Sequence, residues 1–158
     1  MWWLVLCPVF LALSYAEAHA DVSPLRGLES VYLLVEELSA GSVVCGVDEQ
    51  TIRSSIADPL ASGRLKIGSS DNGPTLAANV TTAYAKDVSL CTSSINLLLY
   101  VTQSVSIADT HNEALVPVML WHSGMLLVTG KAQHREQMRG ALEDMAKKLV
   151  VDWTAAQH

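Results

Sequence analysis

The stretch that decides the fold is residues 90–107, LCTSSINLLLYVTQSVSI. From Cys91 to Val101 every second residue belongs to a mostly apolar set, and the residues between them are more polar. This period of two is typical of a strand that buries one face. Residues 75–86, which contain three Thr together with Val80 and Tyr84, precede it across the short link 87–89. We expect the two runs to form an antiparallel hairpin.

The segment before this hairpin predicts a strand, a helix and a second strand. Residues 30–38 alternate like a strand with one well-buried face, and a turn is expected at residues 40–42. Asp48 is the expected N-cap of a helix that runs to about Ser62 and repeats apolar residues every four positions. Residues 64–68 then form a short strand.

The segment after the hairpin predicts more strand and a long helix. Residues 114–128 form one bent strand or two short ones, with Gly124 as the bulge or turn and Pro117 indicating a sheet edge. Residues 131–156 form a helix because one face carries an apolar stripe. Its members are Met138, Leu142, Met145, Leu149 and Trp153.

The expected order is therefore βαββββα, an α+β fold. A helical crossover after the first strand is right-handed and makes the second strand parallel to the first, and the remaining strands continue as a meander. We expect a two-layer sandwich: a sheet of four or five mostly antiparallel strands with two helices on one face.

One local run adds a resemblance. Residues 60–67, LASGRLKI, close the first helix into a strand, and together with the order of elements they resemble the amino-terminal domain of the periplasmic protein TolB. Related domains occur in envelope proteins such as CsgG and LpoB. The resemblance implies an adaptor domain of the bacterial envelope that works through contacts with other proteins.

The first twenty residues are typical of a signal peptide. Residues 2–15 are apolar, and residues 16–20 contain two overlapping A-x-A patterns, which predict cleavage after Ala18 or Ala20. Fourteen apolar residues fall short of the roughly 20 that span a bilayer, so we expect no stable membrane anchor. The protein is expected to be periplasmic or secreted, with residues 21–158 as a single domain.

The charge of the chain bears on its partners, and its cysteine content bears on a disulfide. The formal net charge is −6 and no basic cluster is longer than Lys147-Lys148, which argues against binding to nucleic acid or to anionic membranes. Beyond the leader two cysteines remain, Cys45 and Cys91, and an exported pair predicts a disulfide. The alternative is a reactive Cys45 thiol near a helix start.

No motif predicts a catalytic residue, a metal or a cofactor. His111, His122 and His134 lack the short-range pairing of zinc ligands and are expected at the solvated surface.

Aromatic residues offer a possible binding patch on the uncovered face of the sheet, with Trp121 in the core as the alternative. The candidate patch comprises Trp121, His122, Tyr84 and Tyr100.

Two functions follow from these observations. The first is an exported, non-enzymatic periplasmic adaptor or binding module with an envelope protein as its partner. The second is a small exported hydrolase or thiol enzyme that uses Cys45 or a dispersed histidine–carboxylate pair. The sequence leaves the oligomeric state open.

Overall fold

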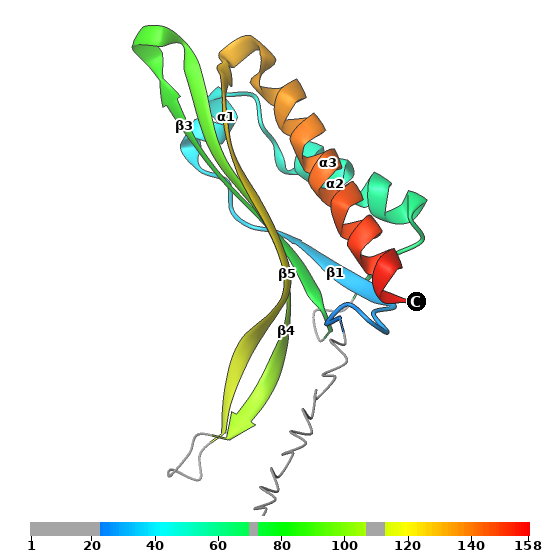
Figure 1. The fold of residues 1–158 in the computed structure, drawn as a ribbon. Coiled ribbons are helices and arrows are strands. Elements are labelled where there is room, and N and C mark those ends of the chain that lie inside the picture. The colour runs from blue at the N-terminus through cyan, green and yellow to red at the C-terminus, as the bar shows by residue number, and fades with distance from the viewer. Residues whose placement is uncertain (1–22, 70–72, 107–112) are drawn as a thin grey trace, which may run out of the picture.

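The computed structural model describes residues 23–69, 73–106 and 113–158 (Figure 1). The predicted leader and most of the predicted loop after residue 107 lie outside these residues. In chain order the elements are β1 Ser30–Val35, α1 Ala40–Val44, α2 Glu49–Ser62, β2 Lys66–Gly68, β3 Thr75–Ala85, a 3-10 turn Lys86–Val88, β4 Leu90–Ser106, β5 Glu113–Gly130 and α3 Lys131–Ala156.

The strands form one five-stranded sheet in the order β2-β1-β3-β4-β5. β1 is parallel to β2, as the helical crossover predicts, and it is also parallel to β3. β3, β4 and β5 form the expected antiparallel meander, and β3 joins the sheet beside β1 instead of beside β2. β1 has apolar residues on both faces, which suits a strand with a neighbouring strand on each side. The three-residue β2 is short and mostly exposed, which suits the edge of the sheet.

The helices α2 and α3 lie together on one face of the sheet (Figure 1). The alternation predicted for β4 is confirmed, because its buried residues are every second one. They pack with the stripes of both helices in a single core. The largest fully buried side chains include Ile52, Ile56, Leu60, Leu76, Ile95, Leu97, Leu99, Met138, Leu142 and Leu149. The α+β two-layer sandwich is thus confirmed.

The start of α2 also agrees with the sequence. The Asp48 carboxylate accepts a hydrogen bond of 2.7 Å from the backbone N–H of Thr51, and this bond lowers the pKa of Asp48. The helix continues through Pro59 to Ser62.

Where a turn was expected, the structure has the short helix α1. Its Gly41 packs directly on β3, since a Cβ at this position would collide with the carbonyl oxygen of Thr82. Ser39, just before α1, bonds the same strand: its hydroxyl donates to the Thr82 carbonyl at 2.9 Å and accepts from the Thr82 N–H at 3.1 Å. In place of the expected turn there is thus a third, small helix, which Ser39 and Gly41 hold against β3.

The expected bulge is also displaced. β5 is one 18-residue strand at the sheet edge, as Pro117 indicated, but its irregularity lies at Leu120, not at Gly124. Leu99 pairs with Trp121 and Tyr100 with Met119, so Leu120 is the extra residue. Gly124 instead leaves room for a neighbouring side chain, since a Cβ there would lie 2.6 Å from Oδ1 of Asn96.

None of the described helices combines the length and the apolar character that a membrane crossing requires.

Candidate functional site

The disulfide joins two elements at one end of the sheet. Cys45 directly follows α1 and Cys91 lies at the start of β4. The two residues are bonded, with their Cα atoms 6.1 Å apart, and both are buried. The predicted disulfide is therefore confirmed. Because Cys45 is oxidised, it has no thiolate to serve as a nucleophile.

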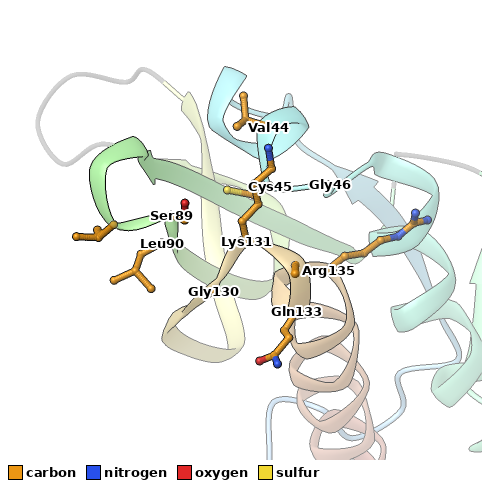
Figure 2. A pocket seen from close by; sticks show the side chains of 11 residues that line it. Val44, Cys45, Gly46, Ser89, Leu90, Gly130, Lys131, Gln133 and Arg135 are labelled. Atoms are coloured by element: carbon orange, nitrogen blue, oxygen red, sulfur yellow. The ribbon is translucent and has the colours of Figure 1, made fainter.

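A hollow of about 830 Å³ opens beside this disulfide. Figure 2 shows that the end of α1, the start of β4 and the first turn of α3 surround it. Its apolar members include Val44 and Leu90. Lys131 places its ammonium 5.3 Å from the centre of the Tyr84 ring, and Arg135 is 3.1 Å from the Asp48 carboxylate. Both cations thus have partners within the protein, and the hollow is mainly an apolar depression.

His134, on the first turn of α3, forms the centre of a buried polar network. Its Nδ1 lies 2.7 Å from Oγ1 of Thr129, and its Nε2 lies 2.8 Å from Oγ of Ser93. Ser93 in turn lies 2.7 Å from the hydroxyl of Thr82. A neutral imidazole donates through one ring nitrogen and accepts through the other, and rotatable hydroxyls suit either tautomer. Burial lowers the pKa of His134, which favours this neutral form.

The buried position of His134 corrects the expectation of a surface histidine. Its side chain is 0% exposed. The sequence placed it at a helix start, but α3 begins directly on β5 and turns this residue inward, toward Ser93.

The pair Ser93 and His134 has the spacing of a nucleophile and its base, yet it cannot work as one. Ser93 is also 0% exposed, so no substrate reaches its hydroxyl. The network instead satisfies polar groups that the fold buries. The sequence did not reveal it because 41 residues separate the two side chains. The available signal was a serine at a buried position of β4, where a hydroxyl needs a partner.

The structure divides the candidate aromatic patch between the two faces of the sheet. Trp121 lies opposite Leu99 on the helix side, and its indole N–H donates to the Asp152 carboxylate on α3 at 2.8 Å. Tyr84 lies opposite Cys91, also on the helix side and at the disulfide end.

His122 and Tyr100 lie on the uncovered face. His122 is opposite Leu98, and Tyr100 is opposite Met119 at the bulge. The structure therefore brings these two members of the candidate patch to one face and separates them from Trp121 and Tyr84.

In the part of the chain that the structure describes, no three His, Cys, Asp or Glu side chains converge as metal ligands. His111 lies outside the described residues.

One exposed apolar feature of the described residues is a two-stranded arm. β3 pairs with β4 only as far as Tyr100, so residues 101–106 of β4 pair with residues 113–118 of β5 alone. Figure 1 shows this arm extending away from the helices. Leu115 is 75% exposed at this arm, and Val105 is 42% exposed. The alternation of apolar and polar residues predicted the two strands. It did not show that β4 and β5 continue beyond the end of β3.

The arm is nearly free of charge. Among residues 101–106 and 113–118, Glu113 is the only charged residue. The arm also contains hydroxyl-bearing residues, among them Ser104, whose Oγ donates to Oε2 of Glu113 at 2.9 Å.

Comparison with known proteins finds no matching family model and no matching curated protein. Among solved structures the fold is similar to a minor lipoprotein from Acinetobacter baumannii, with 10% sequence identity and a TM-score of 0.44. That alignment covers 82% of this chain and 93% of the other.

Proposed function

We propose that this chain is an exported, non-enzymatic binding module of the bacterial cell envelope and that its β4–β5 arm holds a protein partner. The proposal rests on the exposed apolar surface of the arm. A ribbon of only two strands gains little stability by itself in water. A partner that covers Leu115 and its apolar neighbours removes their surface from water, at about 25 cal/mol per Å² of apolar area.

Three observations support the location. The apolar leader with its A-x-A patterns is typical of export. The Cys45–Cys91 bond suits an oxidising compartment. The TolB-like run at residues 60–67 agrees with an envelope domain.

The chemistry of the arm favours protein over other partners. Its one charge is negative, as is the net charge of −6. Phosphate-bearing partners are repelled on average, whereas an apolar ribbon edge suits a protein groove or strand.

The test is capture of partners from envelope extract with the exported chain as bait. Leu115→Asp places a charge in the middle of the arm, while Val151→Asp places the same charge on α3 at a similarly exposed site, 65% against 75%. We expect Leu115→Asp to lose a partner that the parent and Val151→Asp retain. Equal recovery with both variants contradicts the arm as the contact.

A further inference from the structure

We propose that the hollow beside the disulfide binds a small amphipathic monocarboxylate, with the carboxylate at Lys131 and the apolar body against Val44, Val88 and Leu90. The hollow has a volume of about 830 Å³. Sites for small molecules usually measure about 300 to 1,000 Å³. The hollow lies at the start of β4, whereas the arm lies at the end of that strand, so this site is separate from the proposed partner site.

The walls of the hollow are tied to one another. The Cys45–Cys91 bond joins the end of α1 to the start of β4. The backbone N–H of Lys131 donates to the carbonyl of Ser89 at 3.0 Å, which joins the start of α3 to the turn before β4. Because these three walls are held together without a ligand, the hollow is already formed and binding orders little of the chain.

Apolar side chains in the hollow are open to water. Val44 is 42% exposed, Val88 is 62% exposed and Leu90 is 37% exposed. They come from the end of α1, from the 3-10 turn and from the start of β4, and all three line the hollow. An apolar ligand body that covers them removes their surface from water, which favours binding.

The charge of the hollow is opposite in sign to that of the chain. Figure 2 shows the 11 residues that line it, of which Lys131 and Arg135 are charged and none is Asp or Glu. The chain as a whole carries −6. At physiological ionic strength salt screens surface charges beyond about 8 Å, so the cations of the hollow act on a bound ligand more strongly than distant carboxylates do. The hollow therefore favours an anion over a cation.

Of the two cations, Lys131 is the one that a ligand can use. Arg135 donates to Thr51 at 2.8 Å and lies 3.1 Å from the Asp48 carboxylate, and in Figure 2 it turns away toward α2. The partner of Lys131 is the neutral ring of Tyr84, which leaves the ammonium charge in place. Among the described residues no carboxylate forms an ion pair with Lys131. One ammonium matches one carboxylate, whereas the net charge of −6 repels a doubly charged anion more strongly.

Titration calorimetry with four soluble probes tests the site. The exported chain, with its disulfide intact, is titrated at pH 7.5 with decanoate, decyltrimethylammonium, 1-decanol and acetate, each below the concentration at which it aggregates. We expect decanoate to bind one site at least about tenfold more tightly than decyltrimethylammonium or decanol, because it adds a hydrogen bond between charged groups. Acetate, which lacks the apolar body, should show no binding.

Two variants locate the carboxylate, each with a matched control. Lys131→Gln should weaken decanoate binding at least about tenfold and leave decanol binding within about twofold, whereas Lys148→Gln, at an exposed lysine of α3, should bind both probes like the parent. Val88→Asp should reverse the preference, so that decyltrimethylammonium binds more tightly than decanoate. Val151→Asp places the same charge on α3 at a similarly exposed site, 65% against 62%, and should keep the preference of the parent.

Methyl chemical shifts of the parent show where decanoate lies. Binding should shift the methyl resonances of Val44, Val88 and Leu90 and leave those of Leu115 unchanged. Leu115→Asp should bind decanoate like the parent, so a failure of the arm proposal is distinguishable from a failure of this one.

The measurements on the parent decide the outcome even if a variant fails to fold. Equal affinity for decanoate and decyltrimethylammonium overturns the inference, as do methyl shifts that centre on the arm. Binding of the parent to vesicles of phosphatidylcholine and phosphatidylglycerol, without binding of monomeric decanoate, overturns it as well, because the exposed valines would then contact a bilayer.

Discussion

Removal of the Cys45–Cys91 disulfide tests how strongly the bond between the end of α1 and the start of β4 stabilises the fold. The bond closes a loop across a sequence separation of 46 residues. The loss of loop-closure entropy in the unfolded chain gives a stabilisation of about 4 kcal/mol for a loop of this size. That is a large part of the roughly 5 to 15 kcal/mol by which a domain is stable. The double variant Cys45→Ala/Cys91→Ala should lose most of that stabilisation.

The assay is urea unfolding followed by circular dichroism. With an m-value of about 2 kcal/mol per M, the midpoint of the double variant should fall by about 2 M. The parent unfolded in the presence of reductant is the matched control, because it loses the bond and keeps both sulfur atoms in the core. A midpoint shift below about 0.5 M in both samples would refute the reasoning, since the loop would then already be restrained without the bond.

Two further predictions concern the core. Since burial holds the folded-state pKa of His134 below its ordinary value of 6.5, the unfolded chain takes up a proton first as pH falls below 6.5. The free energy of unfolding should then fall by at most about 1.4 kcal/mol per pH unit, and urea titrations from pH 7.5 to 5.5 should show this slope in the parent and not in His134→Gln. Gly63→Ala drives a Cβ into Val150 and should cost about 1 to 3 kcal/mol. Gly63→Ala/Val150→Ala should cost less than the sum of the two single changes, and strict additivity in thermal melts would exclude the contact.

The elements that the sequence predicted share a strong local signal. β4 alternates over most of its length, α3 carries an apolar stripe, and Asp48 precedes α2 with the right side chain for a cap. Each signal depends on neighbours within about one turn or one strand. The disulfide could also be predicted from the sequence, because only two cysteines remain beyond the leader.

The features that the sequence did not reveal depend on distant partners. α1 forms against the β3 backbone, and the extra residue of β5 is set by its register with β4. The inward turn of His134 depends on Ser93 and Thr129. The candidate patch illustrates the same limit, since a bulge at Leu120 determines on which face each β5 residue lies. Pattern within one segment carries no information about such pairings.

The continuity of β5 with α3 has a mechanical consequence. Gly130 ends the strand and Lys131 begins the helix, with no linker between them. A load applied at the tip of the arm and directed along the strand is thus carried straight through the sheet into α3. Such a load shears the ladder between β4 and β5, so many hydrogen bonds resist it together instead of breaking one after another. At the far end of β4, the bond from Cys91 to Cys45 ties the neighbouring strand covalently to α1. Tension that enters at the arm therefore meets the β4–β5 ladder before it reaches α3.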